Sequence, residues 1–394
     1  MATFSVRFLG CKVSQLDAQQ IREALIRGGH GERAGGADVA VVNTCCVTHE
    51  AVRKSRKAAA RAARTHGRVY VTGCGASLAG EPFAGLPENV VVVGRRSDEA
   101  AAFVAGDVGA IGCVQADARL ERVRAFVKIQ DGCSFSCRFC VIPLVRGGTR
   151  SRSAAAVLAE VRKRVRQGHR EVVLTGINLG LFRDGAVRLP ELVRRVAATP
   201  GLARLRLSSI EVNHVDGELA HALRETPGVS RHLHVPLQSG DDRVLRAMGR
   251  RYSSARYLAR LEPLSDFNLT TDVIVGFPAE DERAFERTLR TLEIARISKV
   301  HVFPYSPRPG TSTAHADPVS PQAKKERARR LRAWSDAACR RRWRAKLGSE
   351  DVVLVDRPGR GYGDDYSPWL LDGEPGELRR VRARAVVKEG IVAA

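Results

Sequence analysis

The sequence predicts an α/β protein with three parts: an N-terminal parallel α/β domain, a partial (β/α)6 barrel and a small C-terminal β module. Two observations lead to this fold class. Apolar strand-like runs alternate with helical patterns over most of the 394 residues, which is typical of parallel sheets covered by helices. Near the C-terminus the pattern changes to short strands separated by Gly and Pro turns, which is typical of a small all-β module.

The domain boundaries follow from shifts in composition. Residues 98–121 are rich in Ala, Gly and Asp and show no strong period, so we expect a connector there. The predicted parts are an N-terminal domain over 1–97, the connector over 98–121, the barrel over 122–321, a basic helix over 322–346 and the β module over 347–394.

The N-terminal domain contains the same local pattern three times. Each copy is an apolar run that ends in a turn carrying a cysteine. These runs are Phe4 to Cys11, Val39 to Cys45 and Val69 to Cys74. Helical patterns over Gln15 to Arg27 and Glu50 to Arg64 separate them. In a parallel sheet, ligands bind at the carboxyl ends of the strands, which is where all three cysteines fall.

Six further strand candidates follow, separated in most cases by helical segments. The strands are expected at Ala125 to Ile129, Val172 to Leu174, Leu205 to Leu207, Leu233 to Val235, Asp272 to Val275 and Val300 to Phe303. The helices are expected at Ala154 to Arg166, Pro190 to Ala197, Glu218 to Arg224, Asp241 to Met248 and Asp281 to Ala295. This alternation predicts a barrel open on one side, with its chemistry at the carboxyl ends of the strands.

The charge balance favours a polyanionic partner. Lys and Arg (65) exceed Asp and Glu (43), for a formal net charge of +22. A composition biased toward Arg explains part of this excess, but such a charge also attracts nucleic acid. The basic helix contributes to it with eleven Lys or Arg against two acids over Gln322 to Lys346. For any single Arg of that helix, a solvated face is the simpler role.

Cysteine use and hydropathy indicate an intracellular protein. Nine cysteines, an odd number, and the lack of a secretory signal before the first strand argue against a disulfide framework, so metal binding or catalysis is the better explanation. The apolar runs are far shorter than the roughly 20 residues that span a bilayer. We therefore expect a soluble cytoplasmic protein with no membrane partner.

The motif that carries the chemistry directly follows the first barrel strand. Cys133, Cys137 and Cys140 form a CxxxCxxC run, and thiolates at such close spacing bind iron–sulfur clusters. Three thiolates leave one iron of a [4Fe–4S] cluster open for chemistry. A structural zinc site is the alternative, but zinc usually takes four ligands, and no nearby His or fourth Cys completes such a set.

A second set of thiols consists of Cys11, Cys45 and Cys74, which share one structural position and can also leave an open iron. The alternative is that they are three buried structural cysteines, since free Cys often behaves as a small hydrophobe. Cys46 lies beside Cys45 but is expected to point elsewhere. Cys113 and Cys339 are interpreted as structural.

The CxxxCxxC run in a βα barrel resembles the radical S-adenosylmethionine (SAM) superfamily. With the second cysteine set, nearly the whole chain resembles the radical SAM methylthiotransferase family, which combines a cluster domain, a radical SAM barrel and a C-terminal TRAM module that binds RNA. The matching stretches are Leu9 to Gln15, Asn43 to Cys45, Lys54 to Arg56, Leu174 to Ile177, Leu207 to Glu211, His232 to Gly240, Asp272 to Pro278 and His301 to Ser306.

Within that family the sequence of these stretches is most similar to the MtaB type. That type methylthiolates C2 of N6-threonylcarbamoyladenosine at position 37 of tRNA. The resemblance implies a transferase with two [4Fe–4S] clusters, SAM, the anticodon stem-loop of tRNA as partner and an electron donor such as flavodoxin or ferredoxin. Alternative substrates are isopentenyladenosine in tRNA and a ribosomal-protein aspartate. The chain departs from the family pattern at Cys46, where Thr is common, and at Asn178, where His is frequent.

The resemblance also implies cofactor contacts at the mouth of the barrel, although turn or capping roles explain each residue about as well. Thr175 and Gly176 are expected beside the methionine amine of SAM. Ser209 and Glu211 are expected on the ribose or sulfonium side. The last expected contacts are Gln238 at the carboxylate, and Val275 and Gly276 at the adenine.

In the C-terminal module, Tyr362, Tyr366 and Trp369 fit two roles equally, base stacking or the core of a small barrel. The alternative to an enzyme is an RNA-binding protein that is stabilised by a metal and has no catalytic activity. Six barrel strands are more scaffold than such a binder requires.

Overall fold

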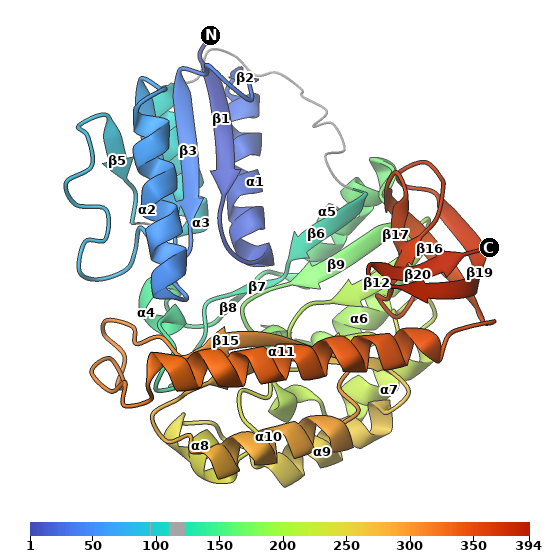
Figure 1. Ribbon diagram of the computed structural model, residues 1–394. Helices are drawn as coiled ribbons and strands as arrows, with labels where there is room; N and C mark the ends of the chain where they lie inside the picture. The colour runs from blue at the N-terminus through green and yellow to red at the C-terminus, as the bar shows by residue number, and fades with distance from the viewer. Residues whose placement is uncertain (95, 110–122) are drawn as a thin grey trace. The chain divides into compact units, whose positions relative to one another are not determined.

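The computed structural model describes residues 1–94, 96–109 and 123–394, and its elements form two compact units (Figure 1). The first unit comprises Met1–Arg119, Gly132–Thr149 and Ser306–Ala316. The second comprises Leu120–Asp131, Arg150–Tyr305 and Asp317–Ala394. The CxxxCxxC loop therefore belongs to the same unit as the N-terminal sheet. The domain boundaries expected from sequence follow chain order, and they stay a prediction.

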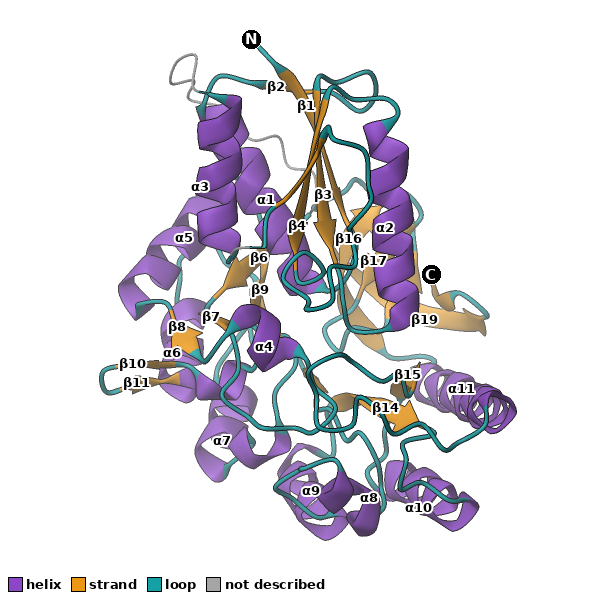
Figure 2. Cartoon of the chain, turned by 90° about the vertical axis from the view of Figure 1, so that its left-hand side faces the viewer, coloured by secondary structure: helices purple, strands orange, loops and turns teal. Residues whose placement is uncertain are grey.

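The first unit is built on a parallel sheet with strand order β2-β1-β3-β4-β5. β3 is buried along its whole length, and its residues alternate between the two faces of the sheet. On one face Val39 and Val41 pack with α1 and α3, and on the other Ala40 and Val42 pack with α2 (Figure 2). The elements are β1 (Thr3–Phe8), α1 (Lys12–Arg27), β2 (Gly31–Glu32), β3 (Val39–Thr44), α2 (His49–Ala63), β4 (Arg68–Gly73), β5 (Val90–Val92), α3 (Ser97–Val108) and α4 (Ile142–Arg146).

One helix of this region lies within the predicted connector. Residues 98–121 are expected to be a connector with no strong period, and within them α3 occupies Ser97–Val108 and buries Ala100, Ala101 and Val104 against the sheet. Its Ala-rich sequence has little amphipathic contrast, and the helix packs against both α1 and the sheet. The remainder of the expected connector lies outside the described residues.

The barrel of the second unit contains the six strands that are predicted from sequence. Two parallel three-stranded sheets, β6-β9-β12 and β13-β14-β15, are joined by the bridges Leu205 to Val229 and Ser209 to His234. The strands are β6 (Arg124–Lys128), β9 (Glu171–Thr175), β12 (Arg204–Leu207), β13 (His232–His234), β14 (Asn268–Val275) and β15 (Lys299–Pro304). The α/β class and the partial six-stranded barrel are thus confirmed.

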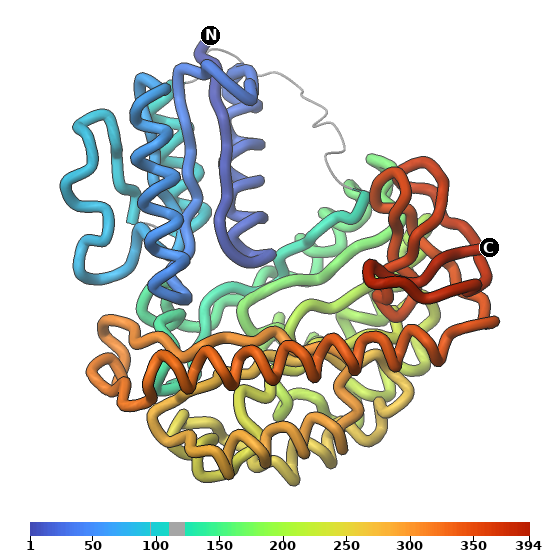
Figure 3. The backbone as a smooth tube through the Cα atoms, viewed as in Figure 1, coloured from blue at the N-terminus to red at the C-terminus, as the bar shows by residue number. Residues whose placement is uncertain are grey.

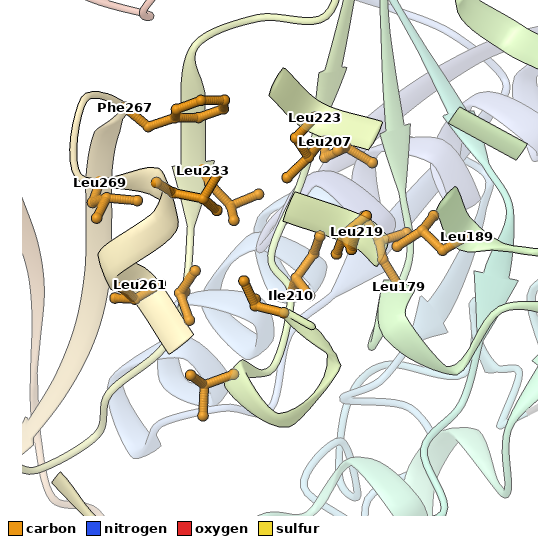
Figure 4. Close-up of a cluster of buried hydrophobic side chains, with 14 of the residues drawn as sticks. Leu179, Leu189, Leu207, Ile210, Leu219, Leu223, Leu233, Leu261, Phe267 and Leu269 are labelled. Carbon is orange, nitrogen blue, oxygen red and sulfur yellow. The ribbon is translucent and has the colours of Figure 1, made fainter. Parts of the chain in front are cut away.

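Helices cover the outside of these strands and form the largest core. Leu207, Leu233 and Leu269 of three strands lie in one buried cluster with Leu219, Leu223 and Leu261 of the covering helices (Figure 4). The helices are α5 (Ala154–Arg166), α6 (Leu189–Ala197), α7 (Gly217–Glu225), α8 (Asp242–Ala247), α9 (Ser254–Leu261), α10 (Glu282–Ile294) and α11 (Pro321–Arg344), and only α9 was not expected. Shorter elements are β7 (Gln130–Asp131), β8 (Arg150–Ser151), β10 (Arg183–Asp184), β11 (Val187–Arg188), and the 3-10 turns η1 (Leu179–Leu181), η2 (Val212–His214) and η3 (Glu262–Leu264).

The basic helix α11 lies along β15 and leads into a closed five-stranded barrel (Figure 3). Ser335 of α11 accepts a hydrogen bond from the Val300 amide at 2.9 Å, which fixes the helix against the strand. The small barrel has strand order β16-β17-β18-β20-β19. Its strands are β16 (Glu350–Arg357), β17 (Arg360–Tyr362), β18 (Pro368–Leu370), β19 (Leu378–Val387) and β20 (Gly390–Ala393).

Aromatic residues of the small barrel have structural contacts. Trp369 is fully buried in its core. Tyr362 and Tyr366 stack on each other with ring centroids 5.1 Å apart, and the Arg124 guanidinium lies 4.7 Å from the Tyr362 ring centroid. These contacts favour the core role over base stacking for Trp369 and join the tyrosines to the larger barrel.

A buried charge network holds the small barrel to the larger one. Glu171, at the start of β9, accepts from Arg206 Nε at 2.8 Å and from Arg204 Nη1 at 3.3 Å. Arg206 also donates to the Gly363 and Asp364 carbonyls at 2.7 and 2.8 Å. Burial would raise the pKa of Glu171, but Arg206 and Arg204 hold that pKa below its usual range. Glu171 therefore stabilises the fold above its unfolded-state pKa, and this contribution is lost as the pH falls through the folded pKa.

None of the described helices is long and apolar enough to cross a membrane.

We predict that Glu171→Gln lowers the free energy of unfolding by about 3 kcal/mol, because two buried arginines lose their counter-charge. Chemical denaturation at neutral pH measures this loss. Glu191→Gln is the matched control, because Glu191 pairs with Arg195 on the exposed side of α6 and its loss has little effect. Equal stability of the two variants would contradict the assigned role of the network.

Candidate functional site

The cysteines of the N-terminal set follow the ends of three adjacent parallel strands. Cys11 is the N-cap of α1 after β1, Cys45 follows β3, and Cys74 follows β4. The register pairs Thr44 with Gly73, so Cys45 and Cys74 leave the sheet at the same level. Cys45 and Cys74 are buried, whereas Cys11 is exposed. The sheet thus brings these three residues to one edge.

Two glycines make the close approach at this edge possible. A Cβ on Gly10 would lie 3.1 Å from Cys45 Cβ and 3.3 Å from Cys45 Sγ, so the turn before Cys11 lies directly against Cys45. A Cβ on Gly73 would lie 2.1 Å from Asn43 Oδ1. Both glycines have positive φ, +127° and +84°, which residues with a Cβ rarely adopt.

The thiols at this edge influence one another electrostatically. Burial raises the pKa of Cys45 to about 11, and Cys74 and Cys11 add to the shift. A hydrogen bond from the Cys46 thiol and the positive charge of Arg146 lower the pKa of Cys74. Cys74 therefore becomes a thiolate, the form that binds metal, more readily than Cys45.

The edge also holds a buried polar group that the described residues leave without a partner. Asn43 is fully buried, and neither its amide nitrogen nor its amide oxygen has a hydrogen-bond partner among them. Such a group is costly unless something satisfies it. Three thiols, a glycine-lined approach and an unsatisfied amide together fit a bound group with sulfur ligands, such as an iron–sulfur cluster.

The CxxxCxxC loop is closed by its own backbone. The Cys133 amide donates to the Gly147 carbonyl, and the Cys140 amide to the Cys137 carbonyl, each at 3.0 Å. The Ser134 and Thr149 side chains bond each other at 3.1 Å across the mouth of the loop. Cys133, Cys137 and Cys140 are each partly exposed, as an open cluster that receives a cofactor requires. This donor set fits a three-thiolate cluster.

Two buried arginines of the first unit were not identified from sequence. Arg146 Nε donates to Cys74 Sγ at 3.0 Å, and Arg146 Nη2 pairs with Asp17 at 2.7 Å. Arg308 donates to the Cys46 carbonyl at 3.2 Å. The sequence separations are 72, 129 and 262 residues, so no local pattern predicts these contacts.

The other cysteines do not extend either set. Cys46 is fully buried and packs with Cys74, Leu78 and Val141. Cys339 donates to the Ser298 carbonyl at 3.1 Å, which agrees with a structural role. Cys113 lies outside the described residues. Among the residues that the structure describes, no three His, Cys, Asp or Glu are arranged to hold a single metal ion.

In the second unit, the residues expected to contact SAM lie at or just beyond the carboxyl ends of the strands. Thr175 ends β9 and Val275 ends β14, each followed by its glycine. Ser209 and Glu211 follow β12, and Gln238 follows β13. Their roles toward SAM stay predictions.

The turn at Thr175 and Gly176 is held by a residue that was not predicted, Gln130 of β7. Its Oε1 accepts from the Ile177 amide at 3.0 Å and from the Asn178 amide at 2.8 Å. A Cβ on Gly176 would lie 2.8 Å from the Gln130 carbonyl oxygen. Gly176 is therefore required by the close approach of two backbone segments.

Other expected SAM contacts already have partners in the fold. Glu211 accepts from the Asn213 amide at 2.9 Å and lies 3.5 Å from Arg250. The Val275 side chain is buried in the core, and the Gly276 amide donates to Glu280 at 2.6 Å. Any contact of Val275 with a cofactor at the mouth of the barrel therefore uses its backbone.

The basic helix α11 is largely neutralised by its neighbours. Arg330 pairs with Glu282 and Glu286 of α10, and Arg341 pairs with Glu293 at 3.1 Å. Four exposed arginines instead occur on β19 of the small barrel, namely Arg379, Arg380, Arg382 and Arg384.

Two family models match this chain, and each of them covers one of the two cysteine sets. The radical SAM superfamily matches residues 127–292, which begin just before the CxxxCxxC loop. The uncharacterized protein family UPF0004 matches residues 3–94, which contain the N-terminal cysteine set. The threonylcarbamoyladenosine tRNA methylthiotransferase MtaB of Thermotoga maritima is 33% identical over 100% of this chain and 96% of its own length. That of Bacillus subtilis is 32% identical over 99% and 95%.

This chain belongs to the MtaB family of methylthiotransferases. The prediction of a radical SAM methylthiotransferase is thereby confirmed. A solved structure of the radical SAM methyltransferase TsrM from Kitasatospora setae, with cobalamin and a [4Fe–4S] cluster bound, shares the fold. Its TM-score is 0.58 at 15% identity, covering 80% of this chain and 77% of TsrM.

We predict that Gly73→Ala destabilises the first unit by about 2 kcal/mol more than Gly80→Ala, because its Cβ would overlap Asn43 and the Thr44 backbone. Gly80 is the matched control, since it has the same φ of +84° and no atom within 4 Å of the position that an added Cβ would take. Thermal unfolding of the cluster-free chain measures the difference. Equal losses would show that backbone strain alone, without the close approach, makes Gly73 necessary.

Proposed function

We propose that this chain inserts a methylthio group at C2 of N6-threonylcarbamoyladenosine at position 37 of tRNA. The observation that carries the proposal is that both three-cysteine sets belong to one compact unit, in which Arg146 of the CxxxCxxC loop reaches Cys74. The relatives from Thermotoga maritima and Bacillus subtilis are named for this nucleoside, which favours it over isopentenyladenosine or a protein aspartate.

The cofactors of the proposed reaction are two [4Fe–4S] clusters, held by Cys11, Cys45 and Cys74 and by Cys133, Cys137 and Cys140, together with SAM. When bound, the second of these clusters supplies the electron that cleaves SAM, and the first carries the sulfur to be inserted. In the net reaction one SAM would give its methyl group to the sulfur and leave as S-adenosylhomocysteine. A second SAM, cleaved with one electron from the reductant, would take the C2 hydrogen and leave as methionine and 5′-deoxyadenosine, so that the adenine C2–H bond is replaced by a C2–S bond.

The chain's own residues prepare this chemistry by binding and by excluding water. Burial of Cys45 and Cys74 keeps solvent from their sulfur atoms, whereas partial exposure of the CxxxCxxC cysteines leaves access for SAM. In the proposal, Thr175 and Gly176 bind the methionine amine on a turn that Gln130 fixes. Ser209 and Glu211 bind the ribose or sulfonium side, as the resemblance implies. Gln238 binds the carboxylate, and the backbone at Val275 and Gly276 binds the adenine.

We further propose that the anticodon stem-loop is the part of tRNA that enters the site. The reductant is an electron donor such as flavodoxin or ferredoxin, and the reaction takes place in the cytoplasm. In this proposal the β19 arginines bind RNA rather than those of α11, because fewer acidic side chains pair with them. Arg380 and Arg382 share the single carboxylate of Glu350, at 3.4 and 3.3 Å, so this strand keeps an excess of positive charge.

We predict that replacing Cys11, Cys45 and Cys74 by Ala abolishes methylthio transfer while 5′-deoxyadenosine is still formed. Liquid chromatography with mass spectrometry of the tRNA nucleosides and of the SAM products measures both. Cys339→Ala is the control and retains both products, because Cys339 belongs to the second unit, where it donates to the Ser298 carbonyl, and is not a member of either cysteine set. Methylthiolated tRNA from the triple variant would contradict the proposal.

We predict that Arg380, Arg382 and Arg384 replaced together by Gln weaken tRNA binding and reduce the slope of log affinity against log salt by about 2. The same charge change at Arg329, Arg330 and Arg341 of α11 is the control and reduces the slope less, because acids pair with these arginines. Filter binding across a salt series measures both slopes. A larger effect in the α11 variant would reassign the RNA contact to that helix.

A further inference from the structure

Arg146 connects the two cysteine sets of the first unit. It is the last residue of α4, six positions after Cys140, and only 7% of its side chain is exposed. Its Nε donates to Cys74 Sγ at 3.0 Å, while its Nη2 pairs with Asp17 of α1 at 2.7 Å. The Asp17 side chain is only 3% exposed. Two charged groups are thus buried beside a sulfur atom of the N-terminal set.

The backbone around Arg146 belongs to the other cysteine set. Gly147, the next residue, accepts a hydrogen bond from the Cys133 amide at 3.0 Å. Val141 and Val145 of the same segment pack against Cys46 and Cys74 in a small apolar cluster. The loop that carries the CxxxCxxC motif is therefore attached to Cys74 both by apolar packing and by a charged hydrogen bond.

The position of this hydrogen bond has an electrostatic consequence. An N–H donor aimed at a cysteine sulfur stabilises negative charge on that sulfur, and hydrogen bonds to sulfur are among the factors that set the potential of an iron–sulfur cluster. Burial strengthens the interaction because the surroundings screen it weakly. Asp17 opposes the effect, since its negative charge lies beside the same guanidinium. Arg308 adds positive charge near Cys46.

We propose that Arg146 is a positioning residue that raises the reduction potential of the N-terminal cluster through its hydrogen bond to Cys74, and that Asp17 moderates this effect. The inference rests on the proposed function, because it requires Cys11, Cys45 and Cys74 to hold a cluster. Cys74 is the ligand through which the CxxxCxxC loop influences the N-terminal cluster.

The contact requires the shape of arginine as well as its charge. One planar guanidinium reaches the sulfur through Nε and the carboxylate through Nη2. A lysine ammonium is a point charge on a flexible stem and does not reproduce this two-sided geometry. Arg146→Lys therefore keeps the charge and loses the directed hydrogen bond.

The test uses the full chain in which Cys133, Cys137 and Cys140 are Ala, so that only the N-terminal cluster can form. After anaerobic reconstitution, a redox titration followed by electron paramagnetic resonance gives its reduction potential. We expect Arg146→Gln to shift the potential downward and Arg146→Lys to shift it downward by less. Asp17→Asn is expected to shift it upward, because a negative charge is removed.

The matched control is Arg138→Gln, which removes the same charge from an exposed position on the same loop and leaves the potential unchanged. Potential shifts of opposite sign for Arg146→Gln and Asp17→Asn support the inference. If the two residues had only a structural role, both variants would shift the reduction potential in the same direction, or neither would shift it. Unchanged potentials in a chain that binds iron overturn it. A background chain that binds no iron overturns the N-terminal cluster itself, and the proposed function with it.

Discussion

The arrangement of both sites depends on one constraint, that adjacent parallel strands end at the same edge of a sheet. In the first unit this brings Cys11, Cys45 and Cys74 together, although they are far apart along the chain. In the second unit the same constraint gathers the residues expected to contact SAM at the ends of β9, β12, β13 and β14. Neither site needs a specialised scaffold, because the polarity of the strands already positions the loops that carry chemistry.

The second feature common to both units is a buried ion pair or ion-pair network. Glu171 lies between Arg204 and Arg206 where the small barrel joins the larger one. Asp17 pairs with Arg146 beside Cys74. In the first case the pairing is structural and joins two modules. In the second case the ion pair lies against the Cys74 sulfur, which we expect to bind iron. The paired charges therefore influence the chemistry of the cluster.

Local patterns were sufficient to predict the strand ends and the cysteines that follow them, because alternation of apolar runs and helices is visible within short windows. They were also sufficient for all six barrel strands. Helix α3 was not predicted because its Ala-rich sequence lacks a clear amphipathic period. Arg146 was not singled out either, because an arginine in a basic chain is ordinary until Asp17 and Cys74 are brought to it. Such long-range partners are set by packing, and the sequence spacing of the residues does not encode them.

The central claim is that one chain holds two open iron–sulfur clusters. The most direct measurement is the iron and acid-labile sulfide content of the full chain after anaerobic reconstitution. We expect about eight irons and about eight sulfides per chain, which corresponds to two [4Fe–4S] clusters. A content of about four, lost entirely when Cys133, Cys137 and Cys140 are replaced, would contradict the claim.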